Sequence, residues 1–304
     1  MTITARHYRD LSDLKEMQAV LSAGRQAANS AYYVHPGDLS WWLYYTDENC
    51  LDKICLWEWN SRLAGWSLLS TSSRTFDVFV TPEMHGRSFE AKIMLWAEEI
   101  QSRHLKKMNS RNIRSMWVAE TDRPRIHWLE LRGFHPNTQG MLHMQRPLGS
   151  DLPAIKLPQG FHLRPVAGEH EVHLRAAASH AAFGSEQPFE TYWPRMQRFM
   201  QSPVYRPEND LVTVSPAGDF ASFCILWPDP VTRVGQFEPV GTHPAFQGRG
   251  LARAVLTAGL QRLQKLGMTQ ANVCVESNNL PAIRLYESLG FQRSFRLLTY
   301  EKPL

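Results

Sequence analysis

Hydrophobic and polar positions in the second half of the chain follow first the spacing of strands and then that of helices. Apolar runs at residues 211–215 and 220–227 flank the turn-forming segment Pro216-Ala-Gly-Asp219, which is typical of two strands joined by a tight turn. Small and apolar residues then recur at helical spacing: Ala252, Leu256, Gly259, Leu263 and Leu266. The pattern predicts a helix over about 248–266 that ends at Gly267.

The remaining segments of this half predict an alternation of strands and helices. Strands are expected at 161–165, 233–242 and 271–276, and helices at 170–183, 189–201 and 281–289. A final strand near 295–300 is expected to close this half. The predicted fold class is α+β, with a mixed central sheet flanked by helices.

The two halves of the chain resemble each other. Pro82 and Pro244 are each followed at the same spacing by Gly-Arg, and both segments open a helical pattern. The segment 281–291 (PAIRLYESLGF) is identical to 124–134 (PRIHWLELRGF) at five of eleven positions. Between the halves lies a proline-rich stretch at 146–160, which opposes regular structure. We therefore predict two tandem domains, 1–148 and 161–304, joined by a linker at 149–160.

Composition narrows the class of protein. The chain has 304 residues, of which 43% are hydrophobic and 20% charged, so a packed core is possible and global disorder is excluded. The formal net charge of +4 is too small to indicate a nucleic-acid partner. The N-terminus has no secretory pattern and no apolar stretch is long enough for a membrane span, which favours a cytoplasmic protein without membrane contact.

The four cysteines do not form a metal or dithiol motif. Cys50, Cys55, Cys224 and Cys274 show no C-x-x-C spacing, and free, mostly buried thiols are expected. His170, His173 and His180 share one predicted helix but lack the H-E-x-x-H pattern, so no metal site is predicted.

The segment Gln247-Gly-Arg-Gly-Leu-Ala252 lies between a predicted strand and a predicted helix. Backbone N–H groups at a helix start attract phosphate oxygens, and glycines allow the backbone to approach them closely. The segment is neither G-x-G-x-x-G nor G-x-x-x-x-G-K-[ST], so the dinucleotide and P-loop fingerprints are absent. Plain helix capping is the alternative.

A second motif follows at a separation of 32 residues. It reads N-x-x-A-x-x-x-Y-x-x-x-G-F and runs from Asn279 to Phe291, while the first reads Q-x-x-G-x-A. With both motifs in this order, the chain resembles the GNAT superfamily of acyl-CoA-dependent N-acetyltransferases. The match is close over about 233–291. The arrangement of two similar halves is similar to that of tandem members of the superfamily in which only one half is active.

The resemblance implies a site for acetyl-CoA as co-substrate. Val240, Gly241 and Thr242 match the strand whose free backbone groups pair with the pantetheine arm, and Pro239 agrees with a local break in pairing. Asn279 matches a position beside the arm. The positions that match the pyrophosphate loop are Gln247, Gly248, Arg249, Gly250, Leu251 and Ala252.

Two residues match the catalytic positions of the family. Glu238 matches the general base, which must take a proton from an ammonium before the free amine can attack. Strand alternation predicts its side chain on the same face as that of Val240, whose N–H is a candidate oxyanion donor. Tyr286 matches the residue that protonates the leaving thiolate. The alternatives are a solvated strand residue for Glu238 and a packed ring for Tyr286.

The first half departs from these motifs. His85, Ser88 and Glu90 stand where Gln247, Gly250 and Ala252 stand in the second half. Leu129 replaces Tyr286, Asp122 replaces Asn279, and Asp77 lies near the position of Glu238: these replacements predict a degenerate, non-catalytic domain.

Two further features of the sequence can each be interpreted in more than one way. Trp41-Trp42 with Tyr44-Tyr45 is either an aromatic wall for the acceptor or, as we favour, core packing. Six basic residues within 103–114 favour a solvated helix end over contact with the CoA 3′-phosphate or with nucleic acid.

The sequence thus predicts transfer of an acetyl group from acetyl-CoA to a primary amine of a small molecule, by direct attack in a ternary complex. The alternatives are a non-catalytic acyl-CoA-binding or regulatory protein and a protein or peptide N-acetyltransferase. The acceptor, the acyl-chain preference, CoA binding by the first half and the oligomeric state stay open.

Overall fold

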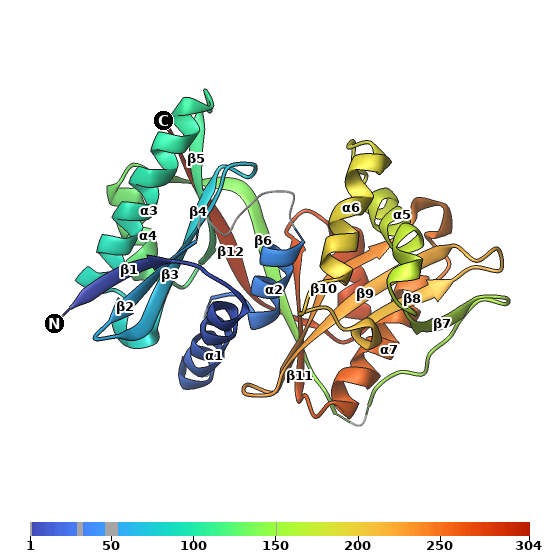
Figure 1. Cartoon of the computed structure of the whole chain (residues 1–304). Coiled ribbons are helices and arrows are strands. Elements are labelled where there is room, and N and C mark those ends of the chain that lie inside the picture. Colours follow the sequence, from blue (N-terminus) through green and yellow to red (C-terminus); the bar gives the residue numbers. More distant parts are fainter. Residues whose placement is uncertain (1, 29–32, 46–53, 150) are drawn as a thin grey trace.

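One continuous sheet runs through both halves of the chain. The computed structural model describes residues 2–28, 33–45, 54–149 and 151–304. Figure 1 shows the two halves side by side, with a strand from each crossing at the middle. The sheet has 12 strands in the order β1-β2-β3-β4-β5-β12-β6-β11-β10-β9-β8-β7. The predicted mixed α+β architecture is confirmed.

The first half contributes six strands and four α-helices within the described residues. Its elements are β1 (Ile3–His7), α1 (Leu11–Ala28), α2 (Pro36–Tyr44), β2 (Ile54–Trp59), β3 (Arg62–Ser70), β4 (Thr75–Val80), α3 (Ser88–Lys107), β5 (Asn112–Ala119), α4 (Arg123–Leu131) and β6 (His135–Pro147).

The second half follows the predicted order of elements. These are β7 (His162–Pro165), α5 (Val172–Ala182), α6 (Phe189–Met200), β8 (Asp210–Val214), β9 (Phe220–Asp229), β10 (Val234–Thr242), α7 (Leu251–Lys265), β11 (Gln270–Glu276), α8 (Leu280–Ser288) and β12 (Gln292–Pro303). Helix α7 begins three residues later than predicted, because Gly248 and Gly250 have φ of +75° and +78° and cannot be part of a right-handed helix.

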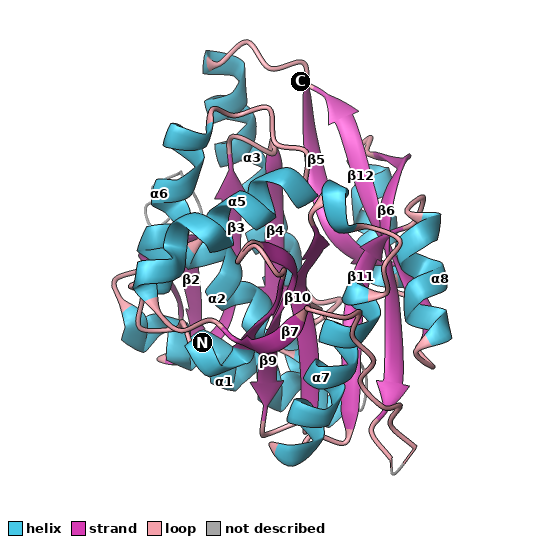
Figure 2. Ribbon diagram, turned by 90° about the vertical axis from the view of Figure 1, so that its right-hand side faces the viewer, coloured by secondary structure: helices cyan, strands magenta, loops and turns pink. Residues whose placement is uncertain are grey.

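Helices cover both faces of the sheet in each half (Figure 2). In the first half, α1 and α2 pack over one hydrophobic cluster and α3 and α4 over another. In the second half, α5 and α6 cover one cluster and α7 and α8 the other. Cys55 and Cys224 are free and buried, as expected, whereas Cys50 lies outside the described residues.

The last strand of each half lies in the other half's part of the sheet. Strand β12 was expected to close the second half, but it pairs antiparallel with β5 and with β6 of the first half. Strand β6 in turn pairs with β11 of the second half, with Cys274 opposite His143. The alternating pattern of a strand does not specify its neighbours, so the sequence could not reveal this exchange.

The exchanged strands also complete the hydrophobic cores. Leu142 and Met144 of β6 are buried in the cluster beneath α7 and α8. Tyr300 of β12 is buried in the cluster beneath α3 and α4. The domain boundaries at 148 and 161 stay a prediction. Residues 151–158 have no regular structure.

Helix α2 of the first half packs directly on strands of the second half. A Cβ added to Gly37 would lie 2.3 Å from Cβ of Trp227, so only glycine permits this approach. His35 Nε2 lies 3.2 Å from the carbonyl oxygen of Val234. Gln236 Nε2 donates to Asp38 Oδ1. The first half thereby reaches the strand that carries Glu238.

Candidate active site

Strand β10 parts from its parallel neighbour halfway along its length. It pairs with β11 only from Val234 to Phe237, opposite Gln270 to Val273. Beyond this point β10 pairs only with β9 on its other side, while β11 continues along β6. The edge of Val240, Gly241 and Thr242 that faces β11 therefore has no strand partner among the described residues, as the resemblance implied. The carbonyl oxygen of Thr242 accepts a 3.4 Å hydrogen bond from Gln247 Nε2. An edge without a strand partner can pair with an extended ligand.

A β-bulge occurs where β10 and β11 separate. The register with β9 shifts between Phe237 and Val240, and the carbonyl oxygen of Glu238 accepts a 2.6 Å hydrogen bond from Trp227 Nε1. The extra residue breaks strand alternation. Val240 consequently packs against the same core cluster as Phe237. The shared face of Glu238 and Val240 was expected from regular alternation, which the bulge interrupts, and it stays a prediction.

The glycine loop leads into α7 as an open turn whose N-cap carries no side chain. Gly250 is the N-cap and has no side chain with which to cap the first turn of α7. A Cβ added to Gly248 or Gly250 would meet nothing within 4 Å. The first N–H groups of a helix lack intrahelical acceptors and carry the positive end of its dipole. Together, these features fit the pyrophosphate of acetyl-CoA.

Helix α8 carries the other two predicted residues. Asn279 is the N-cap, and its Oδ1 accepts a 3.2 Å hydrogen bond from the N–H of Ala282. This bond gives Asn279 a structural role as the N-cap of α8, which the sequence did not predict. Tyr286 is 5% exposed and packs edge-on against Phe291 at 5.8 Å between ring centroids.

Two buried polar residues of the first half lie on elements that contact β10 and β11. Asp38 of α2, 5% exposed, accepts hydrogen bonds from Gln236 Nε2 and from the N–H of His35. His143 of β6 is 4% exposed, stacks on Phe295 and leaves Nδ1 without a partner among the described residues. Neither residue was singled out from the sequence, because nothing local in it indicates that α2 packs on β10 or that β6 pairs with β11.

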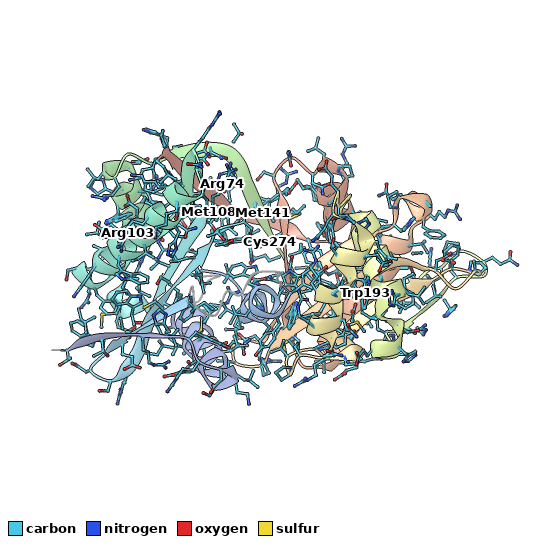
Figure 3. All side chains as sticks on the ribbon, turned by 45° about the horizontal axis from the view of Figure 1, so that its top comes forward. Arg74, Arg103, Met108, Met141, Trp193 and Cys274 are labelled. Carbon is cyan, nitrogen blue, oxygen red and sulfur yellow. The ribbon has the colours of Figure 1, made fainter. Side chains whose placement is uncertain are left out.

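The strand pairing places a cysteine in the same region. Cys274 of β11 lies opposite His143 of β6, and Figure 3 shows Cys274 beside Met141 at the centre of the molecule. Burial raises the pKa of the Cys274 thiol well above its usual range, and the negative charges of Asp38 and Glu238 add to the rise. The thiol is therefore protonated near neutral pH and is a poor nucleophile.

Burial and charge change the protonation of the two candidate catalytic residues. Burial raises the pKa of Glu238 to about 8, and the negative charge of Asp38 contributes to the rise. Burial likewise raises the pKa of Asp38 to about 7. The pKa of Tyr286 is raised above its usual range by burial and by the charge of Glu238. The site therefore combines a carboxyl group that titrates near neutral pH with a phenol that stays protonated.

The corresponding loop of the first half is closed by its own side chain. Glu90 Oε2 accepts a 2.7 Å hydrogen bond from the N–H of Gly86. Glu90 also pairs with Arg125 Nη2 at 2.6 Å and with His85 Nδ1 at 2.9 Å, and His85 Nε2 lies 3.0 Å from Asp122. A cavity of about 250 Å³ is lined by Gly86, Glu90 and Arg125, so space remains beside the turn. The carboxylate nevertheless takes a backbone N–H that a phosphate would need and brings negative charge there, which supports the prediction that this half is degenerate.

Comparisons with known proteins agree with this geometry. The sequence profile of the Acetyltransferase (GNAT) family matches residues 176–291. A mycothiol acetyltransferase from Thermobispora bispora is 27% identical over 241 residues, which cover 76% of this chain and 77% of the relative. Alignments with further mycothiol acetyltransferases span about half the length of those relatives.

Two solved structures share the fold over nearly the whole chain. A tandem GNAT protein from the clavulanic acid biosynthesis pathway has a TM-score of 0.70 at 14% identity, covering 99% of this chain and 98% of its own. A GCN5-related N-acetyltransferase from Sphaerobacter thermophilus has a TM-score of 0.67 at 19% identity, covering 99% and 95%.

The second half of the chain belongs to the GNAT family of acetyltransferases, and the whole chain has the tandem GNAT fold. The protein is an N-acetyltransferase with acetyl-CoA as its co-substrate. None of the helices in the described ranges is long and apolar enough to cross a membrane.

Proposed function

We propose that the second half transfers the acetyl group of acetyl-CoA directly to a primary amine of a small molecule. The observation that carries this proposal is the position of Glu238, a half-buried carboxyl group with a raised pKa at the point where β10 and β11 separate. In this proposal the free edge at Val240, Gly241 and Thr242 holds the pantetheine arm. The loop from Gln247 to Ala252 holds the pyrophosphate.

Glu238 is the proposed general base. A base acts most effectively when its pKa lies near the working pH, and a pKa of about 8 for Glu238 meets this condition. An alkylammonium has a pKa of about 10, as in lysine, so a carboxylate of ordinary pKa would be a much weaker proton acceptor. The proton passes from the ammonium to Glu238, directly or through water, and the neutral amine attacks the thioester.

Tyr286 is the proposed general acid. Its raised pKa keeps the phenol protonated until the thiolate leaves. The N–H of Val240 is the proposed donor to the developing oxyanion. The protonated state of Cys274 favours direct transfer over an acyl-cysteine intermediate.

The acceptor is proposed to lie between the halves, against the face that carries Glu238. Asp38 and His143 of the first half, with Gln236 of the second, supply polar groups there. The likeness to mycothiol acetyltransferases makes amine precursors of mycothiol the first acceptors to test.

The deciding experiment follows thiol release from acetyl-CoA with a panel of small amines. Glu238→Gln and Tyr286→Phe are each expected to lower kcat/KM by about 10²- to 10⁴-fold while CoA binding persists. Glu287→Gln is the matched control, since Glu287 lies beside Tyr286 in sequence but pairs with Arg293 on the surface.

Two outcomes would overturn these assignments. Unchanged turnover in Glu238→Gln and Tyr286→Phe would exclude both residues from catalysis. Tight CoA binding without acetylation of any small amine would favour the binding-protein alternative, and turnover with peptides alone would favour a protein or peptide N-acetyltransferase.

A further inference from the structure

A cavity of about 340 Å³ lies in the first half, apart from Glu238 and the glycine loop. Helix α2 and strands β3, β4 and β5 contribute to its walls. The lining residues that matter here are Trp41, Trp42, Tyr45, Met116, Trp117 and Asp77. Its volume is within the range of sites that bind small molecules, about 300–1,000 Å³.

The cavity occupies the first half's counterpart of the region around Glu238. Strand β4 pairs with its parallel neighbour β5 only at Thr75 and Phe76, so these strands also separate, and Asp77 is the next residue along β4. The cofactor loop of this half, in contrast, is closed by Glu90. The first half has therefore kept a ligand-sized space but has lost the turn that would hold a pyrophosphate.

Aromatic rings form much of the wall. Trp42 and Trp117 lie 5.2 Å apart between ring centroids, and Trp41 stacks on Tyr45 at 3.9 Å. Trp117 has a φ of +62°, in the left-handed region that a bulky side chain rarely adopts. Such backbone strain costs roughly 1–3 kcal/mol and is concentrated at ligand sites.

One buried carboxyl group lies in this aromatic wall. Asp77 is 6% exposed and accepts a hydrogen bond from the Tyr33 hydroxyl. Arg125, the cation whose charge acts on Asp77, pairs at 2.6 Å with Glu90. Indole faces attract cations through their quadrupole, and a desolvated carboxylate attracts them by charge. The wall therefore suits an organic cation better than a neutral or anionic ligand.

We propose that this cavity is a second binding site, which takes a small organic ammonium ion with an apolar body and does not acetylate it. The apolar body lies among Trp41, Trp42 and Trp117, and the ammonium group faces Asp77. The proposal goes beyond the acetyl transfer of the second half and does not depend on which acceptor that half uses.

The test titrates the full-length protein with phenethylammonium and omits acetyl-CoA. Calorimetry gives the affinity and the number of sites, and tryptophan fluorescence is expected to change because three of the ten tryptophans line the cavity. Saturable binding is expected, and Asp77→Asn is expected to weaken it at least about tenfold, as loss of a desolvated charge partner does. Asp219→Asn is the matched control, since it neutralises an exposed carboxyl group far along the chain from the cavity and is expected to leave this binding unchanged.

Two further measurements test whether binding depends on the ligand's charge and whether it takes place in the cavity, and they distinguish both effects from a folding defect. The neutral analogue 2-phenylethanol is expected to bind at least about tenfold more weakly than the ammonium. Ser73→Trp, at an exposed lining position, is expected to abolish binding while CoA binding by the second half shows that the protein is folded. Absence of binding at millimolar concentration, equal binding of the alcohol, or loss of binding in Asp219→Asn but not in Asp77→Asn would each overturn the proposal.

Discussion

At the scale of single residues, the candidate site depends on the proximity of two carboxyl groups from different halves. Asp38 and Gln236 are hydrogen-bonded, and Glu238 follows Gln236 by two residues. The charge of Asp38 contributes to the raised pKa of Glu238. A residue of the degenerate half thereby affects the protonation of the proposed base.

Replacing Asp38 by asparagine tests this relation. The acid limb of kcat/KM against pH is expected to follow the ionisation of Glu238, whose pKa is about 8, so activity rises as the pH increases through that value. Without the negative charge of Asp38, ionised Glu238 is more stable, and the limb should move to lower pH by up to about one unit. The measurement is the pH profile of kcat/KM.

The control for this prediction is Asp219→Asn, at an exposed turn between β8 and β9. Its profile should match that of the parent. A limb that stays in place or moves to higher pH in Asp38→Asn would show that Asp38 does not act on the base.

At the scale of elements, the two glycine loops show how one side chain changes a binding turn. Ala252 of α7 corresponds to Glu90 of α3, and Ala282 of α8 corresponds to Arg125 of α4. In the first half this pair fills the turn with an ion pair. In the second half both positions are alanine, and the turn is open.

Introducing the carboxylate into the second half should close its loop. Ala252→Glu is expected to abolish acetyl-CoA binding, because the carboxylate competes with and repels the pyrophosphate. Isothermal calorimetry is the measurement, with one CoA site per chain expected for the parent and none for the variant. Ala252→Gln introduces a side chain of the same size as glutamate but without its charge. It therefore distinguishes electrostatic repulsion from steric exclusion, and it should retain weak acetyl-CoA binding.

Two results would contradict this interpretation of the loops. Parent protein with two equal CoA sites would show that Glu90 does not close the first. Unchanged affinity in Ala252→Glu would place the pyrophosphate elsewhere.

The sequence predicted elements with local signals and missed those set by distant contacts. The glycine loop before α7, the break at Pro239 and the departure of the first loop from the motif follow from glycine, proline and glutamate at particular positions. The bulge at Glu238, the approach of α2 at Gly37 and the exchange of β6 and β12 depend on residues far apart in the chain. Alternation along a strand indicates which residues face a core but not which strand lies beside it.

At the scale of the whole molecule, the exchange of strands joins the two halves into one continuous sheet, from which we infer that they fold as one unit. Leu142 of the first half is buried in a core of the second, and Tyr300 of the second is buried in a core of the first. Neither half contains all the strands of its own part of the sheet.

Thermal unfolding tests this interdependence. We expect one cooperative transition, raised by acetyl-CoA because the ligand binds the folded state. Leu142→Ala and Tyr300→Ala should each lower its midpoint by at least about 4 °C, since such buried truncations cost roughly 2–5 kcal/mol. Leu266→Ala, at an exposed apolar side chain, is the control with little expected change. Two separate transitions, each affected only by the substitution in its own half, would contradict a single folding unit.

The order of β5 and β12 along the chain has a consequence for synthesis on the ribosome. Strand β5 has β12 as its neighbour, so its edge stays uncovered until residues 292–303 have been made. Uncovered strand edges are templates for pairing between chains. Most multidomain proteins can complete their first domain while the second is still being translated. In this chain the edge of β5 instead stays without its neighbour while residues 120–291 are synthesised, and residues 292–303 determine when the first half can finish folding.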